Sequence, residues 1–218
     1  MHIHNPLKGR LLAALIALAV VLPQLSAIPL WINEIHYSNA SADTGEFVEI
    51  AGDAGTDLSG HTLLFYNGSN GSVYTPSILL TGILPGLSNG YGTLSFSRSG
   101  IQNGSPDGIA LIGPGNFFIQ FLSYEGSFLA AGGAANGQLS QDIGVSETDS
   151  AIAGHSLQLT GIGSTYTDFT WSGPAIDSPG SINTGQIFTA ESIPDSAATI
   201  GLLVIALSSL GISRRFAL

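Results

Sequence analysis

Cysteine is absent from the 218-residue chain. Without a thiol the chain can form no disulfide, use no thiolate nucleophile and build no cysteine-based zinc site. Helical periodicity is also scarce, because no apolar pattern of period 3.6 runs for more than a turn or two between Trp31 and Phe188. A disulfide scaffold is therefore excluded, and a helical bundle is disfavoured.

Basic residues are the second shortage, with five Lys and Arg against fifteen Asp and Glu, for a formal net charge of −10. Between Ile28 and Ser192, Arg98 stands alone against fourteen carboxylates. Binding to nucleic acid or to anionic lipid depends on Lys and Arg that neutralise phosphates. We therefore expect no nucleic-acid partner.

What the chain does have is glycine, 29 residues of it, together with short apolar or alternating runs separated by Asn-Gly, Pro-Gly and other turn signals. These runs predict nine strands, over residues 30–37, 46–51, 61–66, 72–78, 92–97, 108–113, 117–124, 155–160 and 169–172. Residues 129–153, rich in Ala, Gly and Ser, are expected to form a long irregular excursion. The sequence thus predicts an all-β fold, an antiparallel β-sandwich.

The N-terminus has the three parts of a signal peptide. Lys8 and Arg10 precede an apolar run over residues 11–22, Pro23 breaks that run, and small residues follow as far as Ala27. We expect residues 1–27 to be a signal helix that is removed after Ala27, which predicts an exported protein.

The C-terminal segment, residues 191–218, reads as a membrane-spanning helix. An uncharged run of about 17 residues, 197–213, is just long enough to cross a bilayer. Arg214 and Arg215 follow it, and basic residues stay preferentially on the cytoplasmic side. Both ends of the chain are then inside, and the body, residues 28–190, is outside.

The same segment resembles the PEP-CTERM sorting signals of bacteria, especially their VPDSG-CTERM variant. The motif is Ile193-Pro194-Asp195-Ser196, with Ile in place of Val and Ala197 in place of Gly, and the apolar run and the Arg pair follow it. The resemblance implies a processing enzyme of the exosortase type, which cleaves near the motif and releases the protein to the cell surface or the extracellular matrix. A plain single-span anchor is the alternative.

Four phrases of the body resemble the lamin tail domain, in the order found in that family. They are "INEIHY" (32–37), "GEFVEIAGDAGTDLSGHTLLFYNG" (45–68), "SPDGIALIGPGNFFIQFLSYEG" (105–126) and "SLQLTGIGSTYTDFTWSGPAIDSPGSINTGQ" (156–186), with His61 at the usual Trp position. The resemblance implies an immunoglobulin-like sandwich. It also implies an interaction module of the kind found in lamins and in exported bacterial proteins.

Catalytic patterns are weak. Ser88 lies in a G-x-S-x-G match, but a strand rather than a helix follows it, so we expect a turn residue. His36, His61 and His155 lie in or next to strand patterns, without metal-ligand spacing. Glu46 and Glu49 would point to opposite faces of a strand, which excludes them as an acid–base pair. We therefore expect no enzyme.

Two kinds of binding site remain as hypotheses. Acidic loops could offer oxygen ligands to a structural Ca²⁺, the weak candidates being Asp43, Glu46, Asp53 and Asp57. Aromatic rings could line a sugar-binding face, or could be ordinary core and rim residues. They are Trp31, Tyr66, Tyr74, Tyr91, Tyr124, Tyr166 and Trp171.

The sequence as a whole predicts an exported bacterial surface or matrix protein that binds without catalysis. It would be tethered to the inner membrane by its C-terminal helix before sorting. Its expected partners are an exosortase-type enzyme and a surface protein or polysaccharide, with no cofactor beyond the possible Ca²⁺. The alternatives are a small secreted hydrolase and a calcium-stabilised adhesive module.

Overall fold

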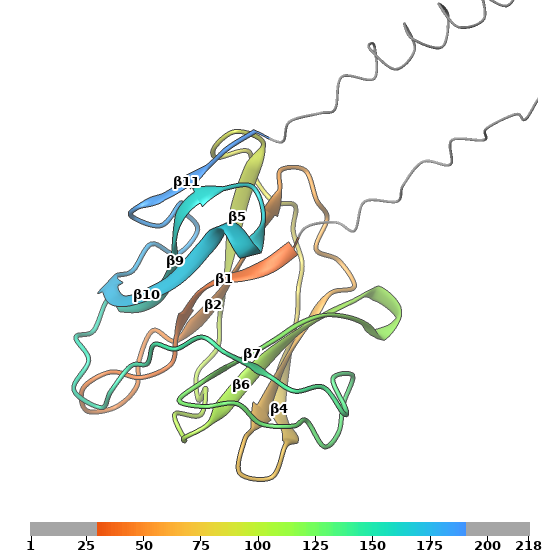
Figure 1. The fold of residues 1–218 in the computed structure, drawn as a ribbon, viewed down its shortest axis with the longest axis vertical. Helices are drawn as coiled ribbons and strands as arrows, with labels where there is room; N and C mark the ends of the chain where they lie inside the picture. The colour runs from red at the N-terminus through yellow and green to blue at the C-terminus, as the bar shows by residue number, and fades with distance from the viewer. Residues whose placement is uncertain (1–29, 191–218) are drawn as a thin grey trace, which may run out of the picture.

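Two β-sheets face each other in the computed structural model, which describes residues 30–190 (Figure 1). The first sheet has the order β10–β9–β1–β2–β5, and β11 pairs with β9 beside this path. Its strands are β1 (Leu30–His36), β2 (Phe47–Asp53), β5 (Tyr91–Ser97), β9 (His155–Gly163), β10 (Phe169–Ile176) and β11 (Gln186–Phe188).

The second sheet has the order β4–β3–β6–β7–β8. Its strands are β3 (Thr62–Asn67), β4 (Ser72–Leu79), β6 (Asp107–Gly113), β7 (Phe117–Tyr124) and β8 (Gln141–Asp142). Two short 3₁₀ turns complete the elements, η1 (Pro114–Asn116) and η2 (Tyr166–Asp168). The predicted all-β sandwich is confirmed.

All nine predicted strands are present, and β10 extends four residues beyond its predicted end. The expectation of a purely antiparallel fold is wrong at two places, because β11 pairs with β9 and β8 with β7 in parallel. Both of these strands were missed. They are only three and two residues long, too short for an alternating pattern to be visible in the sequence.

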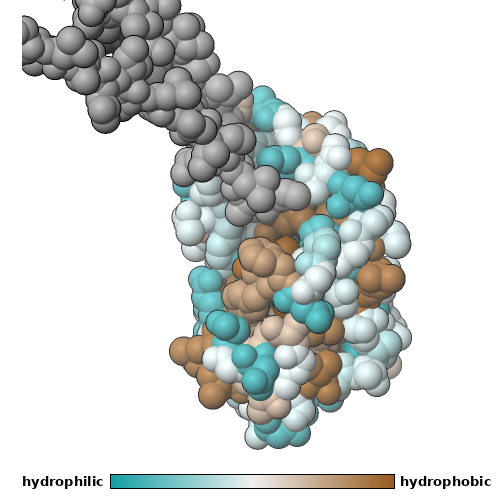
Figure 2. Space-filling model, turned by 90° about the vertical axis from the view of Figure 1, so that its right-hand side faces the viewer, coloured by the Kyte–Doolittle hydropathy of each residue, from teal (hydrophilic) through white to brown (hydrophobic). Residues whose placement is uncertain are grey.

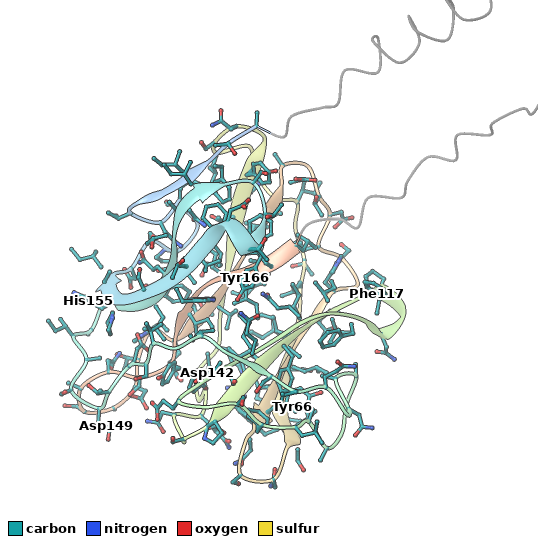
Figure 3. The ribbon with its side chains drawn as sticks, viewed as in Figure 1. Tyr66, Phe117, Asp142, Asp149, His155 and Tyr166 are labelled. Carbon is teal, nitrogen blue, oxygen red and sulfur yellow. The ribbon has the colours of Figure 1, made fainter. Side chains whose placement is uncertain are left out.

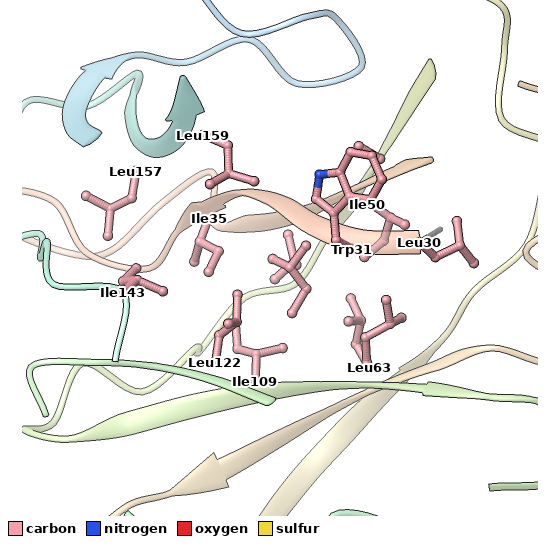
Figure 4. Packing of buried hydrophobic residues seen from close by; sticks show 14 of the residues in the cluster. Leu30, Trp31, Ile35, Ile50, Leu63, Ile109, Leu122, Ile143, Leu157 and Leu159 are labelled. Atoms are coloured by element: carbon pink, nitrogen blue, oxygen red, sulfur yellow. The ribbon is translucent and has the colours of Figure 1, made fainter. Parts of the chain in front are cut away.

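The main core lies between the sheets and is built from inward-facing aliphatic side chains of both (Figure 4). Ile35, Ile50, Leu63 and Leu157 are completely buried. Burial of a side chain of this size contributes about 1.5–3 kcal/mol relative to leaving it in water. The sandwich therefore gives any surface site a rigid frame.

A smaller apolar cluster lies on the outer face of the second sheet. Tyr66, Ala110 and Phe121 from β3, β6 and β7 pack there against Phe128 and Ala130. The last two belong to the excursion that follows β7, which is irregular apart from β8 and a single bridge. The predicted irregular excursion is thus confirmed, and it covers one side of the sandwich.

The predictions for both ends of the chain, 1–27 and 191–218, lie outside the described residues and stay predictions. Within residues 30–190, no helix is long and apolar enough to cross a membrane.

Candidate binding groove

Two adjoining hollows lie along one edge of the sandwich, where β7 and β8 approach the start of β1 and the edge strand β10. Their volumes are about 370 and about 290 Å³, and Tyr166 and Gln141 line both of them. We call the pair the groove. Other residues of the larger hollow include Trp31, Phe118, Gln120, Phe121 and Gln138, and of the smaller one Asp142, Thr167, Phe169, Thr170 and Trp171.

The groove combines aromatic rings with polar side chains. The starts of β1 and β7 line the larger hollow and lie at the right of Figure 1. Figure 2 views that side and shows apolar residues gathered among hydrophilic ones. A concave, mainly apolar surface with a few polar groups is the usual character of a ligand site.

Tyr166, which separates the two hollows, stands on a turn that holds itself in place (Figure 3). The Asp168 carboxylate accepts hydrogen bonds from the backbone N–H groups of Ser164 and Thr165, at 2.9 and 2.8 Å, and from the Thr165 hydroxyl. These backbone bonds lower the pKa of Asp168. The ring is therefore fixed before any ligand arrives.

The Tyr166 hydroxyl oxygen is occupied on its acceptor side. The Trp171 indole N–H donates to it at 3.1 Å, and the Gln120 side chain is a second partner. Burial raises the pKa of Tyr166, and these two hydrogen bonds offset part of the rise. A phenol both accepts and donates hydrogen bonds, so with Trp171 donating to its oxygen the Tyr166 hydroxyl can still donate its own hydrogen.

Gln120 reaches across from β7 to the other sheet. Its Oε1 accepts the backbone N–H of Ile32 at 2.8 Å, and the same side chain interacts with Tyr166 and lowers the pKa of that phenol. The Ile32 N–H is available because β1 pairs with β9 only at Glu34 and Ile35. The first half of β1 thus separates from β9. Trp31 in this half of β1 lines the larger hollow and forms one wall of the groove.

Two further amides of the groove have no internal partner. Within residues 30–190 the side chains of Gln138 and Gln141 make no hydrogen bond. The Asp142 carboxylate uses one oxygen to accept the Gly144 N–H at 3.1 Å. All three are exposed, so donors and acceptors are presented to whatever enters.

A pair of buried glutamates lies elsewhere, on the outer face of the first sheet. Glu34 and Glu49 stand opposite each other on β1 and β2, and neither is exposed. Burial raises the pKa of both carboxyls, that of Glu49 to about 8, and the neighbouring Glu34 charge adds to the latter shift. This pair was not predicted from the sequence, where Glu49 was compared only with Glu46, its neighbour three residues earlier.

Residues 177–186, which we call the closing loop, cover the glutamate pair. The N–H and hydroxyl of Ser178 donate to Glu34, and the Gly180 N–H donates to Glu49 at 2.6 Å. Asn183 donates to the carbonyl of Asn33 on β1 and to that of Leu159 on β9, at 3.2 and 3.0 Å. A substrate cannot reach these carboxylates, so their role is structural.

The three histidines do not meet a nucleophile in the groove, because none of them lines either hollow. His36 is buried and pairs with Glu147 at 2.8 Å; burial lowers the pKa of His36, but this bond and the Glu147 charge raise it overall. The ring of His61 is bonded to the Leu58 carbonyl. Ser88 lies in a tight turn closed on Tyr91, as predicted.

The calcium candidates are not brought together. Asp43 and Glu46 precede β2, whereas Asp53 and Asp57 lie at its far end, more than about 20 Å away along an extended strand. Glu46 is buried and accepts two backbone N–H groups, those of Gly100 and Ile101. Within residues 30–190 no three acidic or His side chains are arranged to hold a metal ion.

Three of the seven predicted aromatic residues meet in the groove, namely Trp31, Tyr166 and Trp171. The other four lie elsewhere in the two cores; Tyr124, for example, stacks on Tyr37 with ring centres 3.8 Å apart. Near the other edge of the sandwich, the Arg98 guanidinium lies over the rings of Phe65 and Tyr74.

Comparison of the chain with known protein families, with curated proteins and with solved structures finds no match.

Proposed function

We propose that this chain is an exported, non-enzymatic binding module. It is a sandwich of the lamin-tail type, displayed at the cell surface or in the extracellular matrix, and it holds its ligand in the groove around Tyr166. The C-terminal motif Ile193-Pro194-Asp195-Ser196, with Arg214 and Arg215, serves as the sorting signal for an exosortase-type enzyme.

The observation that carries this proposal is the state of the groove's polar groups. Tyr166 is locked by Asp168, Trp171 and Gln120, while Gln138 and Gln141 keep their hydrogen-bonding capacity. Tyr166 is already held in place, so it loses little entropy when it contacts a ligand, while Gln138 and Gln141 offer donors and acceptors that have no partner in the described fold. A binding role also agrees with the placement of the histidines, which are held in structural contacts or lie outside the groove.

The test is whether the groove attaches the protein to its own surroundings. The full chain is incubated with surface and matrix material isolated from the producing cells, and the bound fraction is measured. The variant Gln141→Trp places a bulky ring at a position shared by both hollows and should abolish most binding. Asn136→Trp, exposed in the same excursion but outside the groove, is the matched control.

Equal binding by Gln141→Trp and the wild type, with both folded by circular dichroism, would overturn the proposal. The sorting signal is tested separately by the mass of the mature protein from its own cells. A chain cut near Asp195 supports the signal, and a chain that keeps Arg214 and Arg215 refutes it.

A further inference from the structure

We infer that the groove binds a neutral oligosaccharide chain, with one sugar ring against Tyr166 and further units in the hollows on either side. This inference rests on the proposed binding role of the groove and names its ligand class. The structure supplies three arguments, which concern charge, hydrogen bonding and shape.

The charge of the groove opposes an anionic ligand. Among residues 30–190 no Lys, Arg or His lines either hollow, and the rim carries the Asp142 carboxylate. Arg98, the one Lys or Arg among residues 30–190, is 6% exposed and is held by the carbonyls of Pro76, Ser99 and Gly100. An acidic polysaccharide or a phosphate ester would therefore find carboxylate repulsion and no compensating cation.

The free polar groups suit hydroxyl groups. A sugar hydroxyl both donates and accepts, and so does the side-chain amide of Gln138 or Gln141. The Tyr166 hydroxyl accepts the Trp171 N–H and can donate its own hydrogen. Asp142 adds an acceptor with one oxygen unused. This mixture of uncharged donors and acceptors matches a neutral polyol.

The shape of the groove suits a chain of rings. Tyr166 is half-buried, lies between the two hollows and offers flat apolar area beside a polar edge. An extended peptide would instead need a strand edge to extend. Two such edges exist here, one along the part of β7 before Leu122, which β8 leaves unpaired, and one along β10. A strand added to either would fill only one hollow, because β7 lines only the larger hollow and β10 only the smaller one. A ligand that crosses Tyr166 and fills both hollows is therefore better described as a short oligosaccharide than as an added β-strand.

The experiment titrates the full chain, by calorimetry, with neutral cello-, xylo- and manno-oligosaccharides. A polygalacturonate oligomer and an uncharged peptide of similar length are titrated alongside. We expect a neutral oligosaccharide to bind and the other two not to. Tyr166→Ala should weaken binding by at least about tenfold, the equivalent of roughly 1.4 kcal/mol. Gln141→Trp, at an exposed position, should abolish binding without loss of the fold.

Phe117→Ala is the matched control, because Phe117 is 65% exposed on the β6–β7 hairpin but lines neither hollow. It should bind like the wild type. Preference for the acidic oligomer or the peptide would overturn the inference, and so would neutral binding that survives both groove variants. If Gln141→Trp detaches the protein from its matrix while no neutral oligosaccharide binds, this inference fails but the proposed function stands. If that variant stays attached, both fail.

Discussion

The closing loop and the groove are both rich in amide and hydroxyl side chains. These side chains are hydrogen-bonded within the fold at the closing loop, whereas several of them lack such partners in the groove. In the closing loop, Gln186 exchanges two hydrogen bonds with Asn33 of β1, and Asn183 bridges two strands. In the groove, the side chains of Gln138 and Gln141 have no hydrogen-bond partner within the described part of the chain, residues 30–190. Residue type alone thus does not mark a binding site; the difference lies in whether the fold has already satisfied the polar groups.

The largest effect on stability should come from a substitution in the closing loop. Asn183→Ala leaves two buried carbonyls, those of Asn33 and Leu159, without their donor. We expect a loss of about 2–4 kcal/mol in the free energy of unfolding, measured by urea denaturation. Asn136→Ala, at an exposed position, should change little. A loss as small as that of the control would show that the closing loop does not hold the sheet together.

The two buried glutamates beneath the closing loop should make the stability of the fold depend on pH. The pKa of Glu49 is raised from 4.5 to about 8, so the folded state binds a proton that the unfolded state has released. This stabilisation is fully present below about pH 4.5 and is lost as the pH rises to about 8, by at most about 1.4 kcal/mol per pH unit. Chemical denaturation at a series of pH values measures it.

Glu49→Gln removes the titrating carboxyl and should flatten that profile between pH 5 and 8. Part of the slope will remain, because the raised pKa values of Glu34 and His36 also give stabilisation that is lost as the pH rises. An unchanged profile in Glu49→Gln would assign the whole dependence to groups other than Glu49. Glu49 does not line the groove, so the affinity for the groove ligand should be the same in this variant as in the wild type.

A smaller effect is expected from loosening the turn that carries Tyr166. Asp168→Ala removes the acceptor for three hydrogen bonds from Ser164 and Thr165. The fold should persist because this turn is exposed, while affinity for the groove ligand should fall several-fold as the ring loses its fixed position. Asp149→Ala makes the same charge change at an exposed site away from Tyr166 (Figure 3). If both variants bind alike, the turn does not preorganise the site.

The strands could be predicted because their signals are local. Alternation in segments such as 46–51 and 117–124 and the intervening turn residues identified nine strands, whereas β8 and β11 depend on pairing with distant segments. The Glu34–Glu49 pair depends on the register of β1 and β2, which includes an irregularity between Ile32 and Glu34. The only trace in the sequence is a carboxylate placed within each of two apolar strands.

The groove could be predicted only in its residue types. The sequence singled out Trp31, Tyr166 and Trp171 only among seven aromatic residues, all of which belong to the two cores or pack against them. The lock on Tyr166 needs Gln120, which lies 46 positions earlier and on the other sheet. No local pattern encodes a contact of that kind, because it follows from the separation of β1 and β9.

The Asn183 bridge also determines how the domain carries mechanical load. Tension applied beyond residue 190 passes first to β11, whose three residues are paired with β9 from Gly161 to Gly163. It next reaches Asn183, the side chain that joins β9 to the first half of β1. The boundary between β9 and the first half of β1, which we call the seam, lies next to the groove at Ile32, whose N–H is bonded to Gln120. A pull on the C-terminal end and a ligand in the groove therefore act on the same seam.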